Sequence, residues 1–189
     1  MEPAHPTRTD AWNLMTEHVK QDSLRKHMLS VEAVMRAYAP KYSEDQDLWG
    51  ITGLLHDCDY EEFPDLRQHT QIAADWLRSR NYDSRIIQAI LAHNDANNLP
   101  RSTPLEKALY ACDEITGLVT AAALVRPDKS IMSLETASVR KKMKDKAFAR
   151  GVNREDVIRG AEDFGVDLTE HISFVIAAMQ SIAPELGLE

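Results

Sequence analysis

A histidine and an aspartate stand side by side at positions 56 and 57, directly after an apolar stretch that runs from Leu48 to Leu55. The stretch predicts a buried helix, so His56 and Asp57 are expected at its inner end. An unpaired carboxylate is costly to bury, and in proteins it is paired, protonated or bound to a metal. We therefore asked which other histidines and acids could complete a metal site with this pair.

Several other polar residues lie on apolar faces of predicted helices. Asp113, for example, comes four residues after Leu109, and residues at this separation share one side of a helix. Spacings of three, four or seven residues from apolar positions select the following inward-facing residues: His27, His69, His93 and Asp113. His18 and His171 also meet this condition. For any single histidine, a hydrogen-bonded core residue is the more common interpretation.

Four inward histidines and two inward aspartates in one small protein indicate a shared partner, and a divalent cation is the simplest one. The sequence has neither a Cys-x-x-Cys nor a His-Glu-x-x-His motif. The ligands instead come from five separate predicted helices, which is how metal sites are built inside helical bundles. Mixed imidazole and carboxylate ligation suits Mn, Fe, Co, Ni or Zn. We expect one or two divalent ions as the cofactor, with Mg as a further candidate.

Almost the whole chain follows a helical period, and strand signals are few. Helices are expected at these ranges: 10–20, 23–39, 44–56, 67–80, 84–94, 104–125, 133–148, 154–164 and 168–181. Their predicted start signals are Asp22-Ser23, Ser43, Asp83-Ser84 and Thr103-Pro104. We expect one all-α domain over residues 1–189, a compact multi-helix bundle with the metal site in its interior. Its C-terminal helices, at 133–181, are expected to pack on the core.

The composition is that of a globular protein with an acidic balance. Across 189 residues the formal net charge is −8, which argues against a protein that coats nucleic acid. The two cysteines, Cys58 and Cys112, form no disulfide framework and are interpreted as buried thiols in a reducing compartment. Residues Met1–Pro6 carry no cationic apolar leader, and no apolar run approaches the roughly 20 residues of a membrane span. The expected localisation is cytoplasmic without a membrane partner, and a homo-oligomer is left open.

The order of the candidate ligands resembles the HD-domain superfamily of metal-dependent phosphohydrolases. The match is to the family's ordered set His … His-Asp … Asp, which corresponds here to His27, His56-Asp57 and Asp113. With His69 and His93 added, the six residues resemble the pattern of members that bind two metals.

Two further segments strengthen this resemblance. Residues 69–77 are similar to the family's His-x-x-x-Gly-Ala-x-x-Leu stretch, with Ala73 in place of glycine, and residues 86–93 to the helix of its fourth histidine. The resemblance covers about residues 20–125. Parts of the chain at 104–129 and 139–156 resemble a poorly characterised bacterial subgroup of predicted hydrolases.

The resemblance implies a divalent metal and hydrolysis of a nucleotide or another small phosphate ester through a metal-activated water. It implies a first ion held by four residues: His27, His56, Asp57 and Asp113. A second ion would bind His69 and His93, with Asp57 bridging the two. These last three residues are the expected catalytic residues. If one ion binds, the two histidines would contact the substrate phosphate instead.

Residues for substrate binding are less clearly marked. Cys58-Asp59-Tyr60 stands where many relatives have Ile-Gly-Lys, so a lysine contact to phosphate is missing. Arg126 and Lys129, which follow the helix of Asp113, are the expected contacts to a small phosphorylated substrate. The basic segment Arg140–Lys146 is interpreted as a solvated helix face in preference to a rim for phosphate.

The acidic residues near the predicted ligands have two interpretations. Asp59, Glu61 and Glu62 are expected to form an exposed acidic loop, in preference to supplying a general acid. Glu114 either supports a ligand histidine or is exposed.

Two other functions are compatible with the same residues. A di-iron oxygenase would use this ligand frame, because a few relatives place two irons in it. A non-catalytic nucleotide-binding module is disfavoured by the complete ligand set. Some cyclic-dinucleotide phosphodiesterases of the superfamily carry a second histidine after the fourth and a Gly-Tyr-Pro motif. Here Asn94 follows His93 and no Gly-Tyr-Pro occurs, which argues against that class of enzyme.

Overall fold

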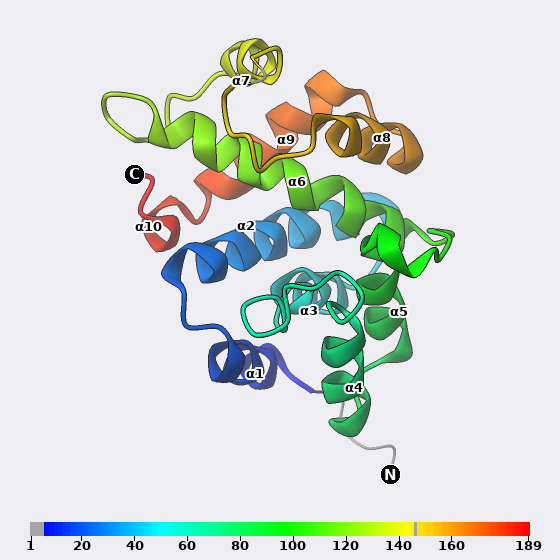
Figure 1. Cartoon of the computed structure of the whole chain (residues 1–189). Coiled ribbons are helices and arrows are strands. Elements are labelled where there is room, and N and C mark those ends of the chain that lie inside the picture. The colour runs from blue at the N-terminus through cyan, green and yellow to red at the C-terminus, as the bar shows by residue number, and fades with distance from the viewer. Residues whose placement is uncertain (1–5, 146) are drawn as a thin grey trace. The chain divides into compact units, whose positions relative to one another are not determined.

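The computed structural model describes residues 6–145 and 147–189, so the sequence interpretations of Met1–His5 and of Lys146 lie outside the described residues. All regular structure in the described part is helical, which confirms the all-α prediction (Figure 1). The α-helices there are α1 (Arg8–His18), α2 (Asp22–Tyr38), α3 (Gln46–Leu55), α4 (Gln71–Ser79), α5 (Ser84–His93), α6 (Pro104–Leu124), α7 (Thr136–Met143), α8 (Arg154–Phe164), α9 (Leu168–Gln180) and α10 (Ala183–Leu186).

The chain falls into two compact units, at residues 1–109 and 110–189. Helix α6 begins in the first unit and ends in the second. The single-domain organisation stays a prediction. Among the described residues, no helix combines the length and the apolar character needed to cross a lipid bilayer.

The first unit is built around α2 and α3, which pack along each other. Gly53 on α3 permits this contact. A Cβ atom at this position would lie 2.9 Å from the backbone nitrogen of Glu32 and 2.9 Å from the carbonyl carbon of Val31, both on α2. Real side chains do not tolerate such distances to backbone atoms, so glycine allows α3 to place His56 close to α2.

Substituting Gly53 with alanine is therefore expected to destabilise the fold by about 1–3 kcal/mol, the usual cost of overpacking. Urea unfolding of wild type and variant measures this free energy. The matched control is Gly117→Ala, because a Cβ there would meet only a Val152 methyl group at 3.7 Å. An equal effect of the two substitutions would contradict the close approach of α3 to α2.

Helix boundaries agree with the predicted ranges where the capping residue was read correctly. Asp83 caps α5 by accepting a hydrogen bond from the Arg85 backbone nitrogen at 2.8 Å. The predictions at Asp22 and Ser43 are wrong. Asp22 lies inside the first turn of α2, and the cap of α3 is Asp45, whose carboxylate accepts from two backbone nitrogens. Ser43 instead ends the short 3₁₀ helix η1 (Ala39–Tyr42) in the left-handed conformation, with φ 56°.

Shorter helices replace two of the predicted ones. The range 67–80 becomes α4, because a series of turns precedes Gln71, and the range 133–148 becomes α7. Helix α10 and the 3₁₀ helix η2 (Asp95–Asn97) were not expected.

In the second unit, α8 packs against α6 through Gly160, where a Cβ atom would lie 2.9 Å from the Ala111 Cα. His171 on α9 is fully buried, and its Nε2 lies 2.9 Å from the Ala111 carbonyl oxygen, which it can only meet as a donor. His171 is thus a core histidine. Burial lowers the pKa of this ring and outweighs the hydrogen bond to Ala111, which raises it.

This lowered pKa predicts a loss of stability in mild acid. Below the ordinary histidine pKa of about 6.5, the unfolded chain binds a proton that the folded chain does not. The free energy of unfolding therefore falls as pH drops from about 7 towards 5, by at most about 1.4 kcal/mol per pH unit from this group. Urea unfolding at pH 7 and 5.5 should show a smaller fall for His171→Gln than for wild type. The same fall in both proteins would contradict a neutral buried ring.

Candidate metal centre

His56 and Asp57 are placed by the end of α3. The helix ends at Leu55, His56 keeps helical backbone angles as its C-cap, and Asp57 begins a series of turns. Two backbone hydrogen bonds fix this reversal, from Cys58 to the Leu55 carbonyl at 3.1 Å and from Tyr60 to the Asp57 carbonyl at 3.0 Å. His56 is fully buried, and Asp57 keeps 14% of its side chain exposed. The carboxylate can therefore be reached from solvent.

Three histidines of the first unit are oriented by a hydrogen bond at Nδ1. His56 meets the Gly53 carbonyl at 2.8 Å and His93 meets the Ile90 carbonyl at 2.7 Å. His69 meets the Asp59 carboxylate at 2.8 Å. Because each partner only accepts, Nδ1 carries the proton, and in the neutral ring the lone pair is on Nε2. This is how metal-ligating histidines are commonly held.

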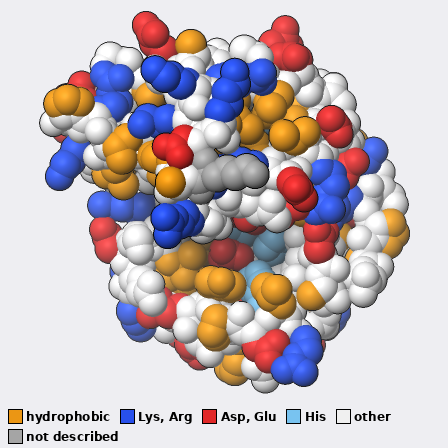
Figure 2. All heavy atoms as spheres, turned by 45° about the horizontal axis from the view of Figure 1, so that its top comes forward, with side chains coloured by type: hydrophobic (Ala, Val, Ile, Leu, Met, Phe, Trp, Pro, Cys, Tyr) orange, Lys and Arg blue, Asp and Glu red, His pale blue; other side chains and the backbone are white. Residues whose placement is uncertain are grey.

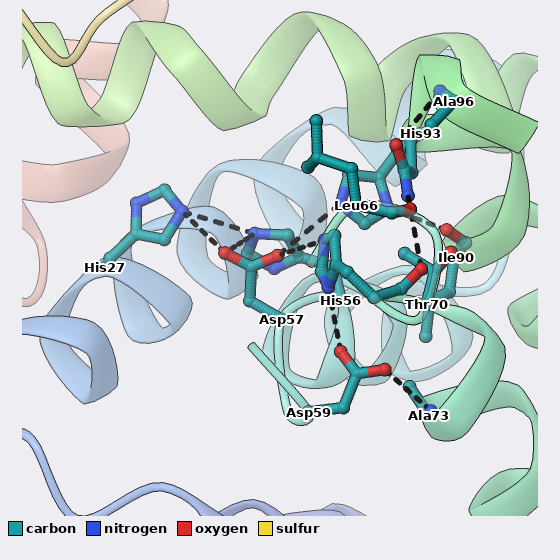
Figure 3. A network of polar contacts seen from close by, with 12 residues as sticks. His27, His56, Asp57, Asp59, Leu66, Thr70, Ala73, Ile90, His93 and Ala96 are labelled. Atoms are coloured by element: carbon teal, nitrogen blue, oxygen red, sulfur yellow. Dashed lines mark hydrogen bonds and ion pairs between the residues drawn. The ribbon is translucent and has the colours of Figure 1, made fainter. Parts of the chain in front are cut away.

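The Asp57 carboxylate lies between two pairs of histidines (Figure 3). Its Oδ2 is 3.9 Å from His27 Nε2 and 3.5 Å from His56 Nε2. Its Oδ1 is 3.3 Å from His69 Nε2 and 3.5 Å from His93 Nε2. One oxygen therefore faces each pair, which is the arrangement that a bridging carboxylate requires.

The Nε2 atoms of His27 and His56 are 3.2 Å apart. Two nitrogens bound to one ion at about 2.0–2.1 Å would lie roughly 3 Å apart, so the observed distance fits ligands of a common metal. Among the described residues of the first unit, two groups have ligand atoms that all lie within 4.8 Å of one another, namely His27, His56 and Asp57, and Asp57, His69 and His93. Imidazole nitrogen with carboxylate oxygen suits a divalent transition metal or zinc.

The electrostatics of the cluster favour a positive charge. Burial of Asp57 raises the pKa of its carboxyl, but His56 together with hydrogen bonds from His69 and His93 outweighs burial and holds this pKa well below its ordinary value. Burial likewise lowers the pKa of His69, yet the carboxylates of Asp57 and Asp59 raise it to about 9. A divalent ion would supply the same kind of charge at the Nε2 lone pairs.

Asp59 corrects the prediction of an exposed acidic loop. Its side chain is fully buried, where one oxygen accepts from His69 Nδ1 and the other from the Ala73 backbone nitrogen, each at 2.8 Å. Glu61 accepts from the Lys20 and Gln21 backbone nitrogens just before α2. Glu62 is exposed and lies 2.9 Å from His18 Nδ1. The loop is thus fastened to α4, to the last residue of α1 and to the segment before α2.

Asn94, which directly follows His93, is a second supporting residue that the sequence did not reveal. Its side-chain nitrogen donates to the Leu66 carbonyl at 2.8 Å and to the His69 carbonyl at 3.1 Å. This amide joins the end of α5 to the segment that carries His69. A candidate ligand at the end of α5 and another in the turns before α4 are held together in this way.

Thr70 adopts an unusual backbone conformation next to a candidate ligand. Its φ of 69° lies in the left-handed region, which β-branched residues rarely occupy. The buried hydroxyl accepts from the Asn97 side chain at 2.7 Å, which helps to hold this conformation. The sharp turn sets His69 at the start of α4.

The remaining predicted site residues lie in the second unit. Asp113 is half-buried on α6, and its role as a ligand of the first ion stays a prediction. Arg126 pairs with Asp128 at 3.1 Å and also donates to the Ser133 hydroxyl, while Lys129 is exposed with φ 52°. The predicted substrate contacts of Arg126 and Lys129 likewise stay predictions.

Two further interpretations concern the second unit. Glu114 accepts a hydrogen bond from the Asn153 backbone nitrogen at 3.1 Å. In the basic segment, Arg140 and Lys141 are exposed on α7, and Lys142 lies over the Phe148 ring at 4.6 Å. These positions fit a solvated helix face.

The two cysteines are buried thiols, as predicted. Cys58 and Cys112 are fully buried, and burial raises the pKa of each thiol, with the neighbouring carboxylates adding to the effect. Both cysteines are therefore inert as thiolates near neutral pH.

Histidine and acidic side chains of the protein are visible from solvent in Figure 2, with hydrophobic side chains beside the histidines.

Histidines gathered around a carboxylate inside a helical protein are typical of helical metal-binding proteins. The family model of the HD domain matches residues 24–118, just over half of the chain, and the chain belongs to this family. The matched range contains the candidate ligands and the loop with Asp59. The HD domain implies the superfamily of metal-dependent hydrolases. Searches of curated proteins and of solved structures gave no match.

Proposed function

We propose that this protein is a metal-dependent phosphohydrolase that acts on a nucleotide or another small phosphate ester. The observation that supports this most strongly is the position of Asp57, with one oxygen towards His27 and His56 and the other towards His69 and His93. Family membership supports hydrolysis by a metal-dependent route.

In this proposal His27, His56 and Asp57 would hold one divalent ion. His69 and His93, together with Asp57, would hold a second. When bound, such ions supply Lewis acidity to phosphate oxygens and lower the pKa of a coordinated water. Asp59, Gly53 and Ile90 keep the proton on Nδ1 of their histidines, so that each Nε2 is available as a ligand atom.

The protein's own contribution is preorganisation. His56, His69 and His93 are at most 7% exposed, so water reaches the cluster mainly from the side of Asp57 and His27. A phosphate that enters there would first meet His27 and Asp57, which are the partly exposed candidate ligands of the first unit. Buried partners would meanwhile keep the imidazoles in place without further rearrangement.

The direct experiment is a panel of phosphomonoesters and phosphodiesters. Metal-depleted protein receives Mn²⁺, Co²⁺, Ni²⁺, Mg²⁺ or Zn²⁺ in turn, with a chelator as the blank. We expect release of phosphate with at least one ion and none with the chelator. His18→Ala is the control variant, because His18 contacts Glu62 outside the cluster. Hydrolysis that is equally fast with the chelator would overturn the proposal, as would the absence of hydrolysis with every ion.

A further inference from the structure

An exposed tyrosine stands beside the candidate metal centre. The side chain of Tyr60 is among the exposed large hydrophobic groups, at 40%. Its ring centroid is 5.0 Å from that of His69, with an angle of 77° between the ring planes. His69 in turn places Nε2 3.3 Å from Asp57 Oδ1. The tyrosine ring is therefore separated from the cluster by one imidazole.

Hydrogen bonds hold the backbone at Tyr60 and the side chains of both neighbouring residues. Its own nitrogen donates to the Asp57 carbonyl at 3.0 Å, and the preceding residue, Asp59, is bound by His69 and Ala73. The following residue, Glu61, accepts two backbone hydrogen bonds from the segment before α2. A tyrosine on a rigid support offers a large contact area, and binding to it costs little further conformational entropy.

A second exposed apolar side chain lies on the same connection between α3 and α4. Leu66 is 55% exposed, and its carbonyl is held at 2.8 Å by the side chain of Asn94, next to His93. Apolar groups fixed beside a charged centre suit a ligand that has a charged end and an apolar end. A phosphate ester of a ring-bearing alcohol has this character.

We propose that Tyr60 is a specificity residue that stacks on a flat ring in the substrate, so that the substrate class is nucleotide-like phosphate esters. The inference rests on the proposed function, because it takes the phosphate to lie at the histidines and Asp57. Stacking of a base on an aromatic side chain strengthens binding by about 5- to 150-fold. An apolar chain without a ring would contact Tyr60 without this contribution.

The test compares two ligands that differ by the adenine base. They are the hydrolysis-resistant methylene phosphonate analogues of adenosine monophosphate and of ribose 5-phosphate. Dissociation constants are measured by calorimetry on metal-loaded wild type, Tyr60→Ala and Tyr60→Phe. We expect wild type to bind the adenosine compound more tightly. Tyr60→Ala should weaken that compound by about 10-fold and the ribose compound by less than about 2-fold, whereas Tyr60→Phe should resemble wild type.

Equal binding of the two compounds by wild type would overturn the inference, and so would equal weakening of both by Tyr60→Ala. Binding is measured apart from turnover, so the proposed function can fail separately. Ring-dependent binding without hydrolysis of the parent esters would support Tyr60 as the specificity residue and overturn the phosphohydrolase assignment. A substitution at an exposed position is expected to leave the fold intact, and the thermal unfolding midpoint of each variant checks this.

Discussion

Replacing Asp57 by asparagine is expected to abolish metal binding and hydrolysis together. The carboxylate lies 3.3 to 3.9 Å from each of the four candidate-ligand histidines of the first unit, His27, His56, His69 and His93. Asparagine keeps the size of the side chain but removes the negative charge and one acceptor oxygen. Loss of a supporting residue costs 10–100-fold in metal affinity, so loss of this shared ligand should cost roughly 100-fold or more.

The measurement is calorimetric titration of metal-depleted protein with Mn²⁺, beside phosphate release under the same conditions. Asp75→Asn is the matched control. It makes the same change of charge on α4, where the exposed Asp75 carboxylate pairs with Arg78 at 2.8 Å. Asp57→Asn with the affinity and activity of this control would show that another site performs the reaction.

Replacing Asp59 by asparagine is expected to weaken the second half of the centre. Its two oxygens accept from His69 Nδ1 and from the Ala73 backbone nitrogen. An amide has one oxygen only, so its NH₂ group must face one of these two donors. His69 then loses either its orientation or the support of its basicity. We expect metal affinity and hydrolysis to fall by about 10–100-fold while the ligand residues stay in place.

Glu62→Gln is the control for this change, because Glu62 lies in the same loop and contacts His18 instead of a candidate ligand. Titration with Mn²⁺ and thermal unfolding are measured for both variants. A fall in metal affinity confined to Asp59→Asn would support its role beside His69. If the two variants bound metal equally well, the hydrogen bond at Nδ1 would have no part in holding the ion.

The fold class was predictable because nearly every helix carries its own signal. Apolar residues at helical spacing locate α2, α5 and α6, and Asp83 and Thr103-Pro104 mark two helix starts. The errors arose where several capping residues compete. Ser43 and Asp45 both have the right chemistry, and only the end of the preceding 3₁₀ helix decides between them. A propensity reading has no access to that tertiary choice.

The inward direction of the candidate-ligand histidines of the first unit was predictable, because periodicity reports which residues face inward. The residues that hold these histidines in place were not predictable. Asp59 was interpreted as exposed because a loop has no period that reveals burial, and Asn94 gave no signal beyond its place after His93. The conformation of Thr70 was also hidden, since a threonine with φ of 69° contradicts its own preference. Such residues become recognisable only when their hydrogen-bond partners are known.

The metal content of the purified protein tests the central claim most directly. Protein is loaded with excess Mn²⁺, separated from free metal by gel filtration and measured by elemental analysis, with wild type beside the double variant His69→Ala, His93→Ala. The histidines converging on Asp57 predict about two ions per chain in wild type and about one in the variant. Wild type without bound metal, or a ratio that does not change in the variant, would contradict the account.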